Sequence, residues 1–196
     1  LPVPSITDVY VEADIYPYQR KMIAKGHYQL KNETNTPIEK VLMTLGPRNT
    51  MTIAMDGAEA TDFNDDYNQW WLTFSNPLQP NETRKFEFEV TRENKGFEDR
   101  GSDTLIVANG TFINNKALLP VFGYNESYQI NDRHERRKRD LPPPERMAKL
   151  EDESQYGFNF LGKDADFINY EAIVSTAADQ IAITPGYLQK EWQEGD

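Results

Sequence analysis

Apolar and polar residues alternate with a period of two along much of the first half of the chain. Such alternation places one set of side chains on a core and the other in solvent, which is typical of a strand in a half-buried sheet. Phe86, Phe88 and Val90 alternate with charged neighbours, so we expect them to be buried together. The pattern predicts six strands, which lie within residues 9–15, 22–30, 41–45, 51–55, 70–74 and 86–90.

The spacing of these strands predicts an all-β fold. Pro, Asn and Gly stand between the strands, Asp56-Gly57 is a turn dipeptide, and the intervals leave no room for crossover helices. Short strands connected in this way form an antiparallel β-sandwich or a curved antiparallel sheet. We therefore expect mainly antiparallel β structure in residues 6–92.

The second half of the chain has a mixed pattern. Residues 104–108 and 117–122 are candidate strands, the alternation returns at 168–174, and Ile181 and Ile183 lead into Pro185-Gly186. One short helix is predicted over 145–150, where helix formers follow three prolines. Without an internal repeat or a low-complexity linker, we expect residues 1–196 to form a single β-domain with one core.

Composition and charge exclude several classes of protein. The 196 residues carry a net charge of −11, which disfavours a general binder of nucleic acid or of anionic membranes. Charged residues make up 27% and aromatic residues 12%, which disfavours a disordered chain. Leu1 to Tyr10 does not read as a signal peptide, and no run of about 18 apolar residues predicts a membrane span. The first residue is not Met, so we expect a soluble piece of a larger protein.

The sequence shows no catalytic centre of its own. It has no cysteine and two histidines, His27 and His134, neither with a second histidine at the spacing of a helical His-Glu-x-x-His zinc site. A nucleophile elbow, a phosphate-binding Gly-Lys-Ser/Thr loop and a dinucleotide-binding glycine motif are also absent. We expect no catalytic residue and no metal site in this chain, whose function is then binding or support of a larger protein.

Some residues remain as candidates for an interface or a binding site. His27 shares a strand face with polar residues and is read as a solvated histidine. Trp70 and Trp71 are neighbours in a strand, so one indole is expected in the core and the other at a domain interface, with stacking on sugar or peptide as the alternative. The basic segment 133–139, which contains Arg136 and Arg137, is expected to pair with carboxylates of the protein or of a neighbouring domain. A nucleic-acid patch, a processing site and a docking arm are its alternatives.

Several short motifs carry a family resemblance that covers nearly the whole chain. Residues 9–17, 25–30, 32–34 with 37–38, and 78–83 resemble the amino-terminal β-domain of aminopeptidase N-like zinc metallopeptidases. Residues 119–124, Asp132 with 136–138, and 175–188 resemble a bacterial branch of this family that is fused to an ABC-2-type transporter permease.

The resemblance implies a saddle-shaped all-β domain that packs on a thermolysin-like catalytic domain, with zinc bound there and not in this chain. It further implies an extracytoplasmic, periplasmic location in a bacterial inner-membrane protein, with the membrane reached only through the parent's transmembrane segments. Classical members offer Gln or Glu to the substrate's amino terminus, whereas residues 109–112 read Asn-Gly-Thr-Phe. This departure argues against ordinary aminopeptidase specificity.

Three functional readings follow. The first is a non-catalytic β-domain that shapes one wall of the cleft of a peptidase-like module. Its expected partners are the downstream peptidase domain and a peptide substrate, and not nucleic acid. The second is an independent module that binds peptide or glycan through the strand at Trp70. The third is a regulatory domain of a pseudo-peptidase. Trp70, Trp71, Tyr124, Arg136 and Arg137 are the candidate interface or binding residues.

Overall fold

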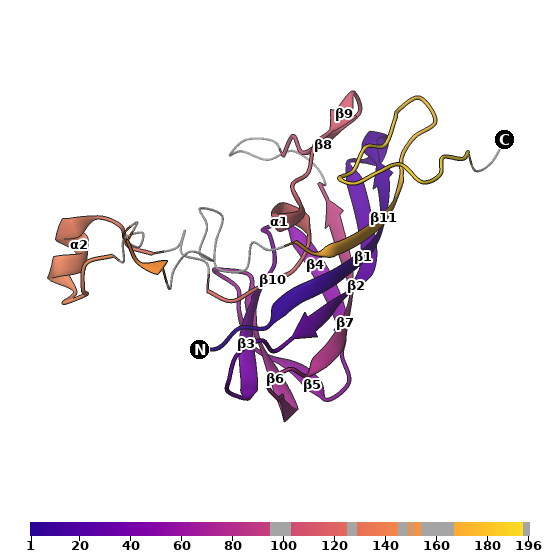
Figure 1. Ribbon diagram of the computed structural model, residues 1–196. Coiled ribbons are helices and arrows are strands. Elements are labelled where there is room, and N and C mark those ends of the chain that lie inside the picture. Colours follow the sequence, from indigo (N-terminus) through magenta and orange to yellow (C-terminus); the bar gives the residue numbers. More distant parts are fainter. Residues whose placement is uncertain (95–102, 125–128, 145–148, 150, 154–166, 194–196) are drawn as a thin grey trace. The chain divides into compact units, whose positions relative to one another are not determined.

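The computed structural model describes residues 1–94, 103–124, 129–144, 149, 151–153 and 167–193 (Figure 1). Two compact units divide the chain: residues 1–123 with 167–196 form a β unit, and residues 124–166 form a second unit. Strands are the main secondary structure and the helices are short, so the fold is all-β, as the alternation predicts.

A five-stranded sheet forms one layer of the β unit, with the strand order β11-β1-β2-β7-β4. Neighbouring strands are antiparallel except β1 and β11, which pair in parallel over the register Asp8↔Asn169 to Asp14↔Ser175 (Figure 1). The prediction of antiparallel structure therefore holds for residues 6–92, whereas β11 runs parallel to β1. The bounds are β1 (Ser5–Tyr16), β2 (Lys21–Lys31), β4 (Asn49–Ala54), β7 (Thr83–Glu93) and β11 (Asn169–Ser175).

A four-stranded sheet with the order β10-β3-β6-β5 forms the other layer. Its strands are β3 (Ile38–Thr44), β5 (Ala58–Asn64), β6 (Gln69–Leu78) and β10 (Val121–Phe122). The short strands β8 (Ile106–Val107) and β9 (Gly110–Thr111) make a separate hairpin. The helical elements are η1 (Pro17–Gln19), α1 (Asn115–Leu118) and, in the second unit, α2 (Arg133–Lys138).

The core lies between the two sheets and is lined by the apolar face of each strand. Phe86, Phe88 and Val90 are all buried, which confirms the predicted register of β7. Tyr28 stacks near Phe86 and donates a hydrogen bond from its hydroxyl to the carbonyl of Pro120 at 3.2 Å, and burial raises the pKa of its phenol. The buried apolar set includes Val9, Val11, Ala24, Leu30, Ile38, Val41, Met43, Leu72, Phe74 and Leu78.

The strand prediction missed β5. Its side chains are mostly exposed, and the pairing with β6 shifts between Thr61 and Asn64, where Asp62 has a positive φ of 51°. Such an irregularity breaks the period of two that marks a strand in the sequence. All six predicted strands are present.

The second half of the chain matches its predicted elements only in part. The strand expected over 117–122 is wrong at its start, because Asn114 caps helix α1 by accepting from the amide of Lys116 at 2.9 Å. Only Val121 and Phe122 are in a strand there, whereas β11 confirms the alternation at 168–174. The helix predicted over 145–150 lies, apart from residue 149, outside the described residues.

Asn32 connects the two sheets through its side chain. It is fully buried, and its Nδ2 donates to the carbonyls of Leu78 at 2.8 Å and Thr36 at 2.9 Å. Its Oδ1 accepts from the amide of Thr34 at 2.9 Å, and its main chain bonds to residues 81 and 82. The motifs at 32–34 and 78–83, which carry the family resemblance, therefore meet at one hydrogen-bonded junction.

A buried ion pair links Arg92 of β7 to Asp103. The guanidinium of Arg92 lies 2.6 Å from a carboxylate oxygen of Asp103, and both side chains are 6% exposed. Arg92 also donates to Oδ1 of Asn49 at 2.7 Å, whose Nδ2 donates in turn to the carbonyl of Ala117 at 2.8 Å. This network holds the segment that leads to α1 in place.

Candidate functional site

Residues 180–188, here called the C-terminal segment, carry four strongly exposed large apolar side chains within nine residues of the β unit. Ile181 is 83% exposed, Ile183 88%, Tyr187 93% and Leu188 79%. Large apolar side chains that are exposed close together in the chain are candidates for a contact with another molecule or domain. Sequence reasoning found the alternation at 181 and 183 but read it as the approach to a turn, without foreseeing the exposure.

The C-terminal segment is tied to the β unit at several points. The amide of Gln180 donates from Nε2 to the carbonyl of Ala108, in the β8–β9 turn, at 2.8 Å. The hydroxyls of Thr184 and Tyr170 are 3.0 Å apart, which links the segment to β11. Tyr18 donates its hydroxyl hydrogen to Asp179 just before the segment. The exposed isoleucines are thus held between anchored residues.

The two tryptophans of β6 lie on opposite faces, as their adjacency predicts. Trp70 packs against the core and stacks on Phe63 with ring centroids 4.7 Å apart. Trp71 belongs to the outer face, where the ammonium of Lys40 lies 4.6 Å from the centre of its ring. A domain interface at Trp71 stays a prediction.

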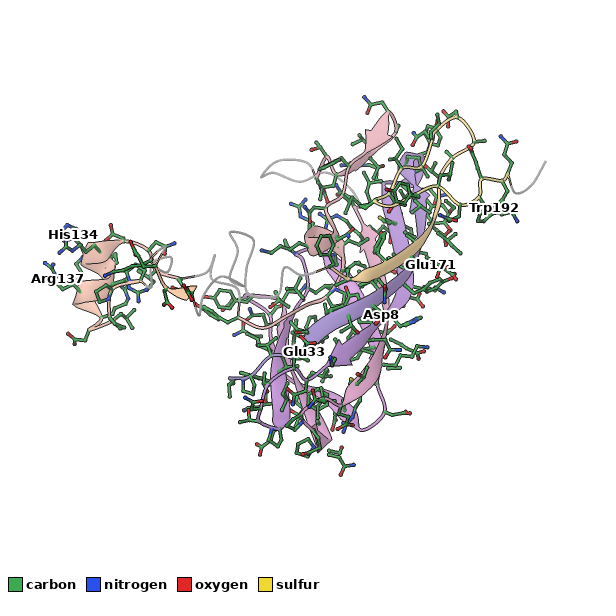
Figure 2. All side chains as sticks on the ribbon, in the orientation of Figure 1. Asp8, Glu33, His134, Arg137, Glu171 and Trp192 are labelled. Atoms are coloured by element: carbon green, nitrogen blue, oxygen red, sulfur yellow. The ribbon has the colours of Figure 1, made fainter. Side chains whose placement is uncertain are left out.

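Arg136 holds the second unit's basic segment in a closed turn. Its Nε donates to the carbonyl of Pro142 at 2.7 Å and its Nη1 to that of Ile130 at 2.9 Å. Arg136 thus holds this turn closed, and an interface role for it stays a prediction. The side chain of Arg137 is exposed, and Figure 2 shows it projecting from α2.

Glu135 pairs with two further cations of the basic segment. It accepts from Lys138 at 2.9 Å and also from Arg139, and these hydrogen bonds lower the pKa of its carboxyl. Asp132 caps α2 by accepting from the amide of Glu135 at 2.8 Å. The pairing of this segment with carboxylates of the β unit or of another domain stays a prediction.

Tyr124 follows the motif at 119–124 and is 60% exposed. Before it, the motif is built into the β unit: Leu119 is buried, Pro120 accepts from Tyr28, and the amide of Gly123 donates to Leu42 at 2.8 Å. The motif thus has a structural use up to Gly123, and an interface role for Tyr124 stays a prediction.

His27 lies on the outer face of the five-stranded sheet, as predicted. Its imidazole stacks on the ring of Tyr10 with centroids 5.4 Å apart. Among the described residues no three His, Asp or Glu side chains are grouped so that they could hold a metal ion. Of the helices in this part of the chain, none is long and apolar enough to cross a membrane.

A shallow hollow of about 410 Å³ lies between β4 and β7 and is lined by Met55, Asp56, Arg84, Lys85 and Glu87 with Ala54. Its cations already have partners: Arg84 lies 2.7 Å from Glu82, and Lys85 lies 2.5 Å from Glu87. The two cations that line the hollow are therefore already paired.

Comparison with known proteins finds similarity among solved structures. No family model matches the chain, and no curated protein matches it. The M1 zinc metallopeptidase from Deinococcus radiodurans aligns at 10% identity and a TM-score of 0.38, over 47% of this chain and 21% of that one. A mutant of the enzyme from the same organism, bound to a Tyr-Ser-Ala substrate, aligns at 10% identity and a TM-score of 0.38, over 50% and 22% of the two chains. The protein described here thus spans about a fifth of the length of these solved chains.

Proposed function

We propose that this chain is a non-catalytic β-domain that packs on an aminopeptidase N-like zinc peptidase domain and forms one wall of its cleft. The observation that carries the proposal is the exposure of Ile181, Ile183, Tyr187 and Leu188, which is the surface expected of a domain that contacts another. The kind of partner comes from the sequence motifs, which resemble the amino-terminal β-domain of these peptidases. Two of the motifs meet at the junction around Asn32.

The finer parts of the proposal rest on the sequence motifs alone. The motifs at 119–124 and 175–188 support a bacterial protein in which the peptidase-like module is attached to an ABC-2-type permease. In that arrangement the domain is extracytoplasmic, in the periplasm, and zinc is bound by the downstream peptidase domain. The chain's own residues would contact the downstream peptidase domain, here called the peptidase body, and line one wall of its cleft without performing a chemical step.

The alternative of an independent peptide- or glycan-binding module is less well supported. It requires an aromatic surface on β6, but Trp70 is turned toward the core and Phe63 covers part of it. Trp71 remains on the outer face beside Lys40. A single outward indole on this strand is a small platform for stacking.

The test is to produce this chain alone and titrate it against the polypeptide that we propose to follow it in the same gene. We expect binding, and an increase in aminoacyl-p-nitroanilide hydrolysis by that polypeptide when the chain is added. The double variant Ile183→Asp with Tyr187→Asp should bind at least tenfold more weakly, because it removes apolar area that docking would bury.

Leu1→Asp is the matched control, since Leu1 is 84% exposed but lies outside the C-terminal segment. It should leave binding unchanged. Absence of any interaction, or a partner polypeptide without a His-Glu-x-x-His sequence, would contradict the peptidase proposal. Binding without any hydrolysis would favour the pseudo-peptidase reading.

A further inference from the structure

The stretch 180–184 within the C-terminal segment combines a strand-like sequence with an unpaired main chain. Ile181 and Ile183 stand at alternate positions between Gln180 and Thr184, and three of the five residues have β-branched side chains, which favour strands. Yet the structure leaves them outside both sheets. Among the described residues, no main-chain hydrogen bond involves the peptide groups of 181–184.

The stretch is nevertheless fixed at both ends. Gln180 bonds to the β8–β9 turn through Ala108, and Thr184 contacts Tyr170 of β11. Gly186, which follows at a positive φ of 104°, ends the stretch after Pro185. Segments whose ends are already anchored lose less conformational entropy when a partner orders them, so this stretch is prepared for binding.

Natural proteins rarely leave a strand-forming apolar stretch uncovered, because unpaired main-chain groups beside exposed apolar side chains invite pairing with another chain. They usually protect such stretches with charge, proline or a bulge. Residues 180–184 contain no charged residue and no proline. By contrast the edge strand β5 carries Glu59, Asp62 and an irregular register.

We infer that residues 180–184 are a recognition strand to which an extended segment of the partner adds by main-chain hydrogen bonding, while its apolar side chains cover Ile181 and Ile183. The inference rests on the proposed function only for the partner's identity as the peptidase body. Strand addition requires an occupant that is extended, with apolar residues at alternate positions, and excludes a helix laid across the isoleucines.

A tethered probe tests the strand directly and needs no peptidase. The complete chain is extended by a flexible Gly/Ser linker of about 10 residues and the probe Lys-Val-Thr-Val-Lys-Val, so that the probe acts at an effective concentration near the millimolar range. Amide hydrogen exchange is then measured by NMR. We expect alternate amides within 181–184 to exchange at least tenfold more slowly than with a probe in which every second residue is Pro.

Variants and the natural partner separate the possible outcomes. Ile181→Asp with Ile183→Asp should abolish the protection, and Leu1→Asp should not. Equal exchange with both probes would overturn the recognition strand whether or not the peptidase body binds. Protection by the probe together with no binding to the peptidase body would remove the proposed function and keep the strand. Binding of the peptidase body while the amides of 181–184 still exchange fast would remove the recognition strand and keep the proposed function. Pairing between two copies of the chain would overturn the assigned partner.

Discussion

At the scale of single residues, close approach and hydrogen-bond geometry decide which side chain the fold accepts. Gly26 lies on β2 where a Cβ atom would come within 2.1 Å of the carbonyl oxygen of Tyr10 and 3.1 Å of the ring of Phe88. Asn32 uses both ends of its amide on fixed main-chain partners. At both positions we expect even a small change of side chain to destabilise the fold.

Replacement of Gly26 by Ala should lower the free energy of unfolding by about 1–3 kcal/mol, because the added methyl group forces β1 and β2 apart. Chemical denaturation of the variant and of Gln29→Ala, on the same strand, measures the difference. Gln29 does not belong to the core, so its truncation should cost well under 1 kcal/mol, or about the range of a surface substitution. Equal stability of Gly26→Ala and the parent would show that the strands separate without strain.

Replacement of Asn32 by Asp should destabilise the protein by about 3 kcal/mol or more at neutral pH. A carboxylate oxygen would then face the carbonyls of Leu78 and Thr36 in place of an amide donor, which buries a negative charge against two acceptors and leaves both carbonyls without their donor. Thermal melting compares it with Asn81→Asp, an exposed position in the same junction. Similar melting temperatures for the two variants would contradict the role assigned to the amide of Asn32.

At the scale of elements, the sequence predicts strands where one face is buried and fails where exposure or capping takes over. The β7 register follows from Phe86, Phe88 and Val90 alternating with charges, because only one register buries all three. Strand β5 escapes prediction since its outer position gives it little apolar content.

Helix α1 escapes prediction because a single cap at Asn114 outweighs a weak strand pattern. The candidate site follows the same division. Opposite faces for Trp70 and Trp71 are predictable from their adjacency in one strand. The exposure of Ile181 and Ile183 is not, because it depends on which segments the tertiary structure leaves outside the sheets.

The buried pair of Arg92 and Asp103 should make stability depend on acid pH. Burial alone would raise the pKa of Asp103, but the amide of Leu105 and the guanidinium groups of Arg92 and Arg48 lower it below its usual value of 3.8. A lowered folded-state pKa contributes stability that is complete above the unfolded value and is lost as the pH falls through the folded value. The parent should therefore lose this contribution only below about pH 4.

Asp103→Asn tests this linkage. It leaves Arg92 buried without its carboxylate, so the free energy of unfolding at pH 7 should fall by about 3–5 kcal/mol, and the difference from the parent should shrink below pH 4. Glu89→Gln is the control, because the Glu89–Lys25 pair is exposed and is worth about 0–1 kcal/mol. A constant difference between Asp103→Asn and the parent from pH 7 to pH 3 would refute the linkage.

At the scale of the whole molecule, the chain has a well-packed β core and polar networks that serve structure. The buried polar groups described above, Asn32, Asn49, Arg92 and Asp103, bond to main-chain or side-chain partners within the fold. Ile181, Ile183, Tyr187 and Leu188 of the C-terminal segment are exposed, and exposed apolar side chains also lie elsewhere, among them Phe112 and Phe167. The exposed residues of the C-terminal segment are those through which we propose that the chain contacts another domain.

The last prediction concerns zinc and catalysis by the isolated chain. With no cysteine and two histidines, the chain would have to bind zinc largely through carboxylates, which suit calcium better because zinc prefers nitrogen and sulfur ligands. Isothermal titration of the purified chain with zinc should therefore show no stoichiometric submicromolar site, and aminoacyl-p-nitroanilides should remain intact after prolonged incubation. The variants His27→Ala and His134→Ala separate the possible sources of any weak binding. Tight binding that survives both substitutions would reveal a carboxylate site, and would assign to this chain the metal that we place in its partner.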